Sequence, residues 1–305
     1  MQYNLLVVLG ATATGKTNLA VHLAKEFDGE IISADSRQIY RGMDLGTGKD
    51  LEEYVLDGTP IPYHLIDIAD AGYKYNVFEF QQDFVKAFED ISQRKRLPVV
   101  CGGTGMYLEA VLKGYKLIAV PKDQQFRDEM ELKSMEELEA ILRSYKELHN
   151  TSDLETKKRA IRAIEIERYY ASHPEIDMNY PEMNPLLVGI KFDRDSRRRR
   201  ITQRLKERLK SGMIEEVESL LKSGVSTEDL MYYGLEYKFL TQHVIGELSY
   251  NEMFTGLEIA IHQFAKRQMT WFRKMERSGS NIHWLDGYMP LEEKVEKVKS
   301  LMEKG

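Results

Sequence analysis

The sequence predicts an α/β fold, in which a parallel sheet forms the core and helices make up an insertion and the C-terminal part. Three observations support this prediction. Strand and helix patterns alternate through the first third of the chain, which is typical of βα units that build a parallel sheet. A glycine-rich loop stands between the first apolar strand and the first helix. Residues 117–184 are charged and helical in character, without a strong strand pattern.

The expected elements follow from the spacing of apolar residues. Short apolar runs predict buried strands at Leu5–Leu9, Glu30–Ala34, Pro98–Cys101, Leu186–Phe192 and Ile282–Leu285. Helical spacing predicts one helix after the first strand, with Leu19, Leu23 and Phe27 on its buried face, and another before the third strand, marked by Val77, Phe80, Phe84, Phe88 and Ile91. Residues 194–277 are helical in pattern, and a charged helix is expected at the C-terminus.

Prolines frame the expected insertion. Pro121 stands at one end, and Pro174, Pro181 and Pro185 stand at the other. We therefore expect the first part of the core in residues 1–116, a helical insertion in 117–184, and the remainder of the core with the C-terminal helices in 185–305.

Composition limits the possible functions. The 305 residues have a formal net charge of -6, so any nucleic-acid binding must come from local basic patches. The single cysteine, Cys101, excludes an intramolecular disulfide and a cysteine-based zinc cluster, which fits a reducing compartment. No apolar run approaches the roughly 20 residues of a membrane span, and the first residues resemble a strand more than a signal peptide. We expect a cytoplasmic protein without membrane contact.

The glycine-rich loop matches the phosphate-binding pattern G-x-x-x-x-G-K-[ST] in full. Its residues are Gly10, Ala11, Thr12, Ala13, Thr14, Gly15, Lys16 and Thr17. In this P-loop NTPase-like arrangement the backbone amides surround phosphate oxygens, Lys16 supplies a positive charge, and the Thr17 hydroxyl can bind Mg²⁺. The motif indicates a polyphosphate ligand and not ATP in particular. An NTPase usually has a strand that ends in a metal-binding acid, whereas the strand at 98–101 is followed by Gly102-Gly103-Thr104, which weakens the ATPase hypothesis.

Asp35 follows the second expected strand, at the edge where open α/β sheets bind their ligands. Its carboxylate could act as a general base or lie close to a bound metal. An aspartate that closes a turn is an equally good explanation of the residues alone.

The segment that begins at this aspartate, Asp35–Lys49, closely resembles the tRNA dimethylallyltransferases. Further matches follow in the order found in that family, at Pro62–Asp67, Gly102–Tyr107, Arg159–Glu165 and Ala265–Arg273. The resemblance covers nearly the whole chain, from Leu5 to about Asp286. It is weakest at Met231–Lys238, where the family usually has Gly-Tyr followed by a basic residue.

The resemblance implies a reaction. A dimethylallyl group would pass from dimethylallyl diphosphate to the exocyclic amine of the adenine 3′ of the anticodon in tRNA, with release of diphosphate. The phosphate loop would hold the diphosphate together with Mg²⁺, for which Thr17 is the implied ligand. Asp35 would be the base, and Lys16 and Thr104 would complete the catalytic set. The alternative for Thr104 is a helix cap.

The resemblance also implies tRNA contacts. Those near the reaction centre would come from Asp35, Ser36, Arg37, Gln38 and Thr104, and those in the insertion from Arg127, Lys158, Arg159, Ala160, Ile161 and Arg162. Gln38 carries both a donor and an acceptor, which suits the reading of a base edge. The target adenine is stacked in the anticodon arm, so it must be extracted before it can react. The implied partners are the tRNA anticodon arm and dimethylallyl diphosphate, and we expect a monomer.

Two basic stretches have competing explanations. Residues 191–210 contain ten Lys or Arg against three acids, which could follow a phosphate backbone or form a solvated helix face. The second stretch has Lys266, Arg267, Arg273 and Lys274, interleaved with two aromatic residues. Trp271 and Phe272 could stack on nucleotides, but aromatic residues at helical spacing favour a core position.

Three other functions are compatible with parts of the sequence. A P-loop small-molecule kinase would share the loop and the sheet. An adenylate isopentenyltransferase would act on free nucleotide and would not need an insertion that carries Arg127 and Arg162. An RNA-binding module with an inactive loop is disfavoured by the intact Lys16, Thr17 and Asp35.

Overall fold

The computed structural model describes residues 2–115, 117, 119–148, 152–173 and 180–304. The chain divides into two compact units, one made of residues 1–115 and 181–305 and the other of residues 116–180. Pro174, one of the prolines expected to frame the insertion, lies outside the described residues. Within the described ranges, no helix has the combination of length and apolar character needed to cross a membrane.

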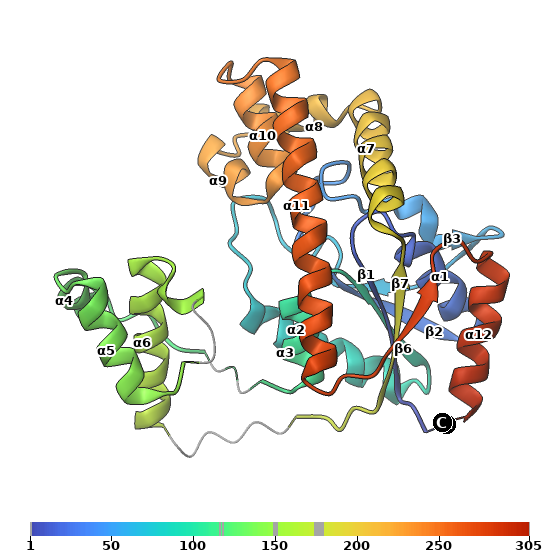
Figure 1. Ribbon diagram of the computed structural model, residues 1–305, viewed down its shortest axis with the longest axis horizontal. Helices are drawn as coiled ribbons and strands as arrows, with labels where there is room; N and C mark the ends of the chain where they lie inside the picture. The colour runs from blue at the N-terminus through green and yellow to red at the C-terminus, as the bar shows by residue number, and fades with distance from the viewer. Residues whose placement is uncertain (1, 116, 118, 149–151, 174–179, 305) are drawn as a thin grey trace. The chain divides into compact units, whose positions relative to one another are not determined.

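The larger unit contains a six-stranded parallel sheet in the order β5-β2-β6-β1-β7-β8 (Figure 1). Its strands are β1 (Leu5–Gly10), β2 (Gly29–Ala34), β5 (Tyr63–His64), β6 (Leu97–Gly102), β7 (Pro185–Lys191) and β8 (Ile282–Asp286). The α/β prediction and its five strands are thereby confirmed. The sequence prediction missed β5, which has only two residues, and the short antiparallel pair β3 (Val55–Leu56) and β4 (Thr59–Pro60).

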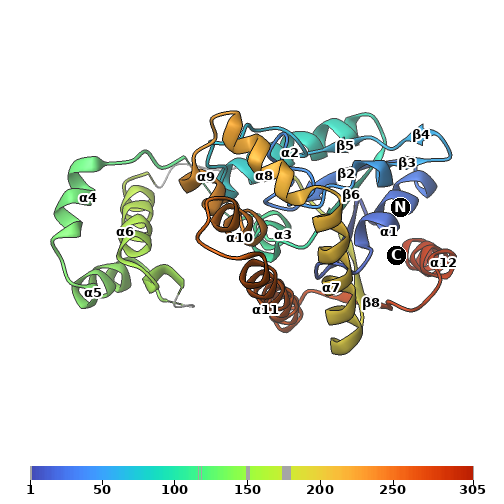
Figure 2. The ribbon, with the colours of Figure 1, turned by 90° about the horizontal axis from the view of Figure 1, so that it is seen from above.

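The central strand β1 is buried on both faces of the sheet, which explains its continuous apolar run. Leu5, Val7 and Leu9 belong to one core cluster, and Leu6 and Val8 belong to another. The first cluster is covered by α2 (Val77–Gln93), α3 (Gly105–Leu112) and α11 (Tyr250–Arg277). The second is covered by α1 (Lys16–Glu26) and α12 (Leu291–Lys304), as Figure 2 shows.

Helix α2 begins with a capping box, because the Asn76 side chain accepts from two backbone amides while Glu79 reaches back to the Asn76 amide. Its apolar face contains Phe80, which has no exposed surface and stacks on Tyr107 of α3 with ring centroids 4.0 Å apart. The amphipathic helix predicted from this apolar spacing is therefore present.

Phe80→Ala is expected to lower the free energy of unfolding by about 3–5 kcal/mol, because it removes a fully buried ring and leaves a cavity. Urea denaturation would measure the loss. The matched control is Ile259→Ala, which shortens a side chain that is 50% exposed and should cost about 0.5 kcal/mol or less. Equal losses in the two variants would show that the α2–α3 contact contributes little.

The helical prediction for residues 194–277 is also confirmed. This region contains α7 (Arg194–Lys210), α8 (Met213–Lys222), α9 (Thr227–Tyr232), α10 (Leu235–Val244) and α11. A short 3-10 helix, Leu51–Tyr54, lies before β3. The smaller unit contains α4 (Gln124–Glu131), α5 (Met135–Tyr145), the 3-10 turn Ser152–Leu154 and α6 (Lys157–Ser172). It has its own core, which includes Phe126, Leu138 and Leu142.

The register of the sheet places three loops side by side. Gly102 of β6 is level with Leu9 of β1 on one side and with Ala34 of β2 on the other. Because all three strands are parallel, the residues that follow them leave the sheet at the same edge. The phosphate-binding pattern, Asp35 and the Gly-Gly-Thr segment therefore begin at one place in the fold.

Candidate functional site

The loop between β1 and α1 has the geometry of a phosphate-binding loop. Gly15 has a φ of 79° and Ala13 a φ of 61°, so the chain curls through left-handed conformations before α1 begins at Lys16. The Thr14 hydroxyl donates a hydrogen bond to the Ala11 carbonyl at 2.9 Å, which stabilises the loop conformation. Backbone amides and the positive end of α1 consequently face the same space.

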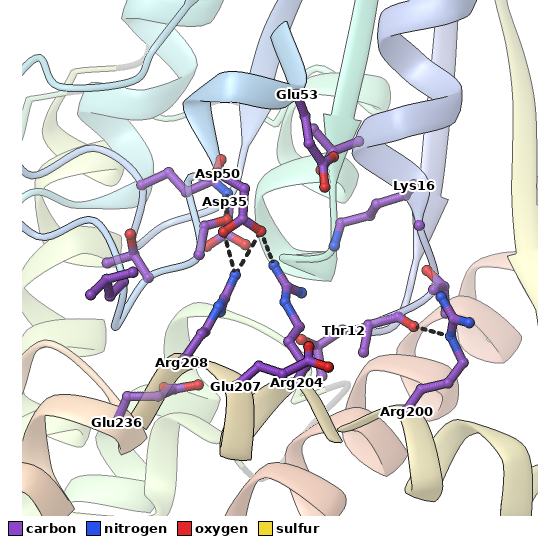
Figure 3. Close-up of a pocket in the computed structure, with 18 of the residues that line it drawn as sticks. Thr12, Lys16, Asp35, Asp50, Glu53, Arg200, Arg204, Glu207, Arg208 and Glu236 are labelled. Carbon is purple, nitrogen blue, oxygen red and sulfur yellow. Dashed lines mark hydrogen bonds and ion pairs between the residues drawn. The ribbon is translucent and has the colours of Figure 1, made fainter. Parts of the chain in front are cut away.

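This space is a cavity of about 650 Å³ in the larger unit (Figure 3). Thr12, Ala13, Thr14, Gly15, Lys16 and Thr17 line it, so the loop is open to a ligand. The predicted residues Asp35, Arg37 and Gln38 also line it. Thr104 and Ser36 lie beside the cavity and not in its lining.

Lys16 is partly buried at the cavity wall. Burial lowers the pKa of its ammonium group, while the nearby Cys101 and the Asp35 carboxylate act to raise it. A bound diphosphate would act in the same direction as Asp35, since it too favours the charged amine. Burial also raises the pKa of the Cys101 thiol to about 11, which makes this cysteine a poor nucleophile at neutral pH.

The side chains of Asp35 and Thr104 both accept hydrogen bonds from backbone amides of the segment Ser36–Arg37. Asp35 Oδ1 accepts a hydrogen bond from the Arg37 amide at 3.1 Å, and Thr104 Oγ1 accepts one from the Ser36 amide at 3.2 Å. Asp35 thus closes a turn, as the simpler explanation of the sequence proposed, and also faces the cavity. Thr104 is the N-cap residue of α3, as the alternative explanation expected, but its side chain makes no capping hydrogen bond.

Arg37 and Gln38 are held by other parts of the protein. Arg37 forms an ion pair with Glu236 of α10 and lies over the Phe264 ring, 4.9 Å from its centroid. Gln38 is only 8% exposed; its side-chain oxygen accepts from the Ser33 hydroxyl at 2.9 Å and its nitrogen donates to the Gly48 carbonyl at 3.0 Å. Base reading by Gln38 would require these bonds to rearrange, and it stays a prediction.

The cavity lining includes three arginines of the basic helix α7 that the sequence analysis did not single out. Arg200 donates to the Ala13 carbonyl at 2.8 Å, and Arg204 and Arg208 form ion pairs with Asp50 at 2.6 and 2.7 Å (Figure 3). These arginines are four residues apart and share one helix face, a spacing that could have revealed them. Part of the basic stretch therefore lines the cavity.

Asp50 is the acidic partner of Arg204 and Arg208. Burial acts to raise the pKa of its carboxyl group, but the guanidinium groups of Arg208 and Arg204 outweigh it and lower that pKa. The carboxylate is thus held charged opposite the phosphate loop. Other cavity residues that the sequence analysis did not assign to the site include Glu52, Glu53, Arg199, Gln203, Glu207, Glu236, Phe264 and Gln268.

Near the end of α11 the two aromatic side chains take different positions. Phe272 is fully buried, which confirms the preference for a core position. Trp271 is partly buried and packs against the same core cluster. Lys274 lies 4.9 Å from the centroid of the Trp271 ring.

A metal at this site would need ligands beyond the protein. Among the described residues, no group of three or more His, Cys, Asp or Glu side chains could hold a metal ion. Thr17 does line the cavity beside the loop amides. This arrangement suits Mg²⁺, which commonly binds one or two protein oxygens, substrate phosphates and several waters.

In the smaller unit, the predicted tRNA-contacting arginines surround a buried glutamate. Glu165 is 4% exposed; Arg127 donates two hydrogen bonds to it, at 2.9 and 2.6 Å, and Arg162 also pairs with it. Lys158 and Arg159 are exposed. The side chains of Ala160 and Ile161 lie in the core of the unit, so only their backbone could contact a ligand.

Glu165→Gln is expected to destabilise the smaller unit by about 2–3 kcal/mol at neutral pH. Burial raises the pKa of Glu165, but Arg127 and Arg162 outweigh it and lower the pKa to about 2. The stabilisation is therefore present above the ordinary carboxyl pKa of 4.5 and is lost as the pH falls towards about 2. Hydrogen exchange of α6 amides, from neutral pH down to about pH 4, would show the difference between parent and variant begin to shrink.

The matched control for this prediction is Glu155→Gln, since Glu155 is an exposed partner of Arg159 in the same unit. Its effect should be about 1 kcal/mol or less. A pH-independent loss in Glu165→Gln would contradict the account.

Comparisons with known proteins assign the chain to a family. The family model described as IPP transferase matches residues 38–275, and one described as isopentenyl transferase matches residues 3–63. The first match covers most of the chain, including Gln38, Thr104 and the insertion. The chain belongs to the IPP transferase family. A tRNA dimethylallyltransferase of Bacteroides fragilis is 63% identical over 97% of both chains, and one of Phocaeicola vulgatus is 59% identical over 99% of this chain and 98% of its own.

Solved structures agree with this assignment. A full-length tRNA isopentenylpyrophosphate transferase from Bacillus halodurans is 29% identical and has a TM-score of 0.73, with 99% of this chain and 96% of that chain covered. A eukaryotic dimethylallyltransferase acting on tRNA has a TM-score of 0.76 at 21% identity, which shows the fold alone; it covers 93% of this chain and 73% of its own. The family assignment favours a prenyltransferase over a kinase or an enzyme of free adenylate.

Proposed function

We propose that this prenyltransferase moves a dimethylallyl group from dimethylallyl diphosphate to the exocyclic amine of the adenine 3′ of the anticodon in tRNA. One observation carries the proposal: the phosphate loop, Asp35 and the Thr104 segment begin at the level ends of three adjacent strands. This register supports the proposal, because the loop that would bind the diphosphate begins next to a carboxylate that could take a proton.

The donor end of the reaction depends on charge. As the C–O bond to the allylic carbon breaks, the negative charge of the departing diphosphate grows. Loop amides, the N-terminus of α1 and the Lys16 ammonium group all face the cavity and would stabilise that charge. Mg²⁺ with Thr17 as its protein ligand would neutralise further diphosphate charge.

The acceptor end depends on Asp35. An adenine amine is a weak nucleophile because its lone pair is delocalised into the ring. As its nitrogen bonds to the allylic carbon, a proton must leave that nitrogen, and the Asp35 carboxylate is the group that would accept it. Thr104, with the Ser36 amide bonded to its hydroxyl, would help to hold the base.

We further propose that the helical insertion, residues 117–184, binds the tRNA. Arg127 and Arg162, held by Glu165, and the exposed Lys158 and Arg159 supply positive charge there. The adenine would be extracted from the anticodon stack to reach Asp35. Since one chain supplies every residue of the proposed site, a monomer would suffice.

The test is incubation with dimethylallyl diphosphate, Mg²⁺ and unmodified tRNA, followed by mass analysis of the nucleosides. We expect one dimethylallyl group on the adenosine 3′ of the anticodon, and none in a tRNA with guanosine at that position. Free AMP in place of tRNA should remain unmodified. Prenylation of AMP with no reaction of tRNA would contradict the proposal.

A further inference from the structure

Gln268 of α11 reaches both loops of the proposed site. Its side-chain oxygen accepts a hydrogen bond from the Thr12 amide at 2.9 Å, and its side-chain nitrogen donates one to the Gly103 carbonyl at 2.9 Å. The residue is 7% exposed and lines the cavity. A single amide group thus joins the phosphate loop to the segment that carries Thr104.

The backbone of the Gly103 loop lies close against this amide. A Cβ atom on Gly103 would lie 2.5 Å from the Gln268 nitrogen and 3.0 Å from the Gly10 carbonyl oxygen. Three residues further along the same helix face, the Trp271 ring packs so closely that a Cβ atom on Gly105 would lie 2.4 Å from it. Helix α11 therefore supports both the start of the phosphate loop and the turn before α3.

The bond to Thr12 has a consequence for the phosphate loop. The Thr12 amide is directed at Gln268 and not at a ligand, so it fixes the orientation of the peptide from which the following amides curl. A loop held in this way keeps its remaining donors aimed before the diphosphate arrives. The bond to Gly103 places the second loop relative to the first.

We propose that Gln268 is a positioning residue that holds the donor-binding loop and the Gly102–Thr104 segment in one register. This inference rests on the proposed function, in which the first loop places the allylic carbon and the second helps to place the adenine amine. A displacement reaction requires these two atoms in near contact, and a misplacement of about 1 Å can cost about 100-fold in rate. Gln268 touches neither substrate in this scheme and acts through the two loops.

The principal variant is Gln268→Met, which keeps the length of the side chain but removes both hydrogen bonds. We expect the single-turnover rate of prenyl transfer, at saturating donor and tRNA, to fall by about 10- to 100-fold. Binding of inorganic pyrophosphate, measured by calorimetry, should change by less than about threefold, because the other loop donors remain. The KM for the donor should likewise change little, so the effect falls on kcat.

A second variant separates the two bonds. Gln268→Glu keeps an oxygen to accept from Thr12 but places another oxygen against the Gly103 carbonyl, and it adds a negative charge near the diphosphate. We expect a loss of rate at least as large as in Gln268→Met, together with weaker pyrophosphate binding. The matched control is Gln263→Glu, the same change at an exposed glutamine of α11, which should leave both readouts unchanged.

Rates are expressed per pyrophosphate-binding site, so that partial loss of folded protein does not alter them. If Gln268→Met transferred the prenyl group at the parental rate per site, the proposal would be overturned. Gln268 would then serve only to stabilise the core. A rise in the KM for the donor with unchanged kcat would also overturn it. Failure of the proposed function looks different, because the parent protein would then transfer no dimethylallyl group to tRNA.

Discussion

Asp35→Asn is expected to lower the single-turnover rate of prenyl transfer by roughly 10²- to 10⁴-fold. The asparagine can still accept the hydrogen bond from the Arg37 amide, so the turn that Asp35 closes should persist. It cannot accept the proton that leaves the adenine amine. Binding of tRNA and of pyrophosphate should therefore be largely retained while the chemical step slows. Rapid-quench measurement with tRNA and donor in excess over their dissociation constants would isolate that step.

Asp57→Asn is the matched control for this variant, because Asp57 is an exposed carboxylate in the turn between β3 and β4. Its rate should equal that of the parent protein. Equal rates in Asp35→Asn and the parent would remove Asp35 from the role of base.

Lys16→Met is expected to lower kcat/KM for dimethylallyl diphosphate by roughly 10²- to 10³-fold. Methionine preserves much of the apolar stem of Lys16 but removes the ammonium group that faces the cavity. Because the charge on the diphosphate is largest as the bond to carbon breaks, part of the loss should appear in kcat and part in KM. Steady-state kinetics with varied donor at saturating tRNA would separate the two.

At the other end of α1, Lys25→Met serves as the control. Lys25 is paired with Asp57 on the surface, and its replacement should leave the kinetics unchanged. A Lys16→Met enzyme with parental kcat/KM would show that the Lys16 ammonium group does not stabilise the leaving group.

Much of the fold could be predicted because its strands are buried on both faces. Leu5–Gly10 and Leu97–Gly102 have no exposed residue, so their sequences are continuous apolar runs with sharp ends. The edge strand Tyr63–His64 has too few residues to produce a pattern, and only its pairing with β2 defines it. The phosphate loop was equally clear, since its function requires glycines and a lysine at fixed spacing.

The rest of the site depends on tertiary contacts. Gln268 lies 256 residues after the amide that it binds, and Asp50 lies more than 150 residues before Arg204 and Arg208. Residue spacing along the chain cannot predict contacts between residues so far apart. These contacts form only because α7 and α11 pack beside the sheet. Gln38 shows a different limit, since its residue type suggested base reading whereas its side chain is bonded to the nearby residues Ser33 and Gly48.

The insertion illustrates a further limit. Its helical character could be predicted from composition, but the role of Glu165 could not. A glutamate in a charged helix is expected to be exposed to solvent. In the fold it is buried and holds Arg127 and Arg162. The burial of Ala160 and Ile161 likewise depends on how α6 packs against α5.

The most direct test of the account is a single-turnover reaction in which released diphosphate and prenylated adenosine are measured together, with and without ATP. We expect one diphosphate for each prenylated adenosine, the same yield in both conditions, and unchanged ATP. Consumption of ATP without prenylation of tRNA would contradict it, because the phosphate loop would then serve phosphoryl transfer and Asp35 would have no amine to deprotonate.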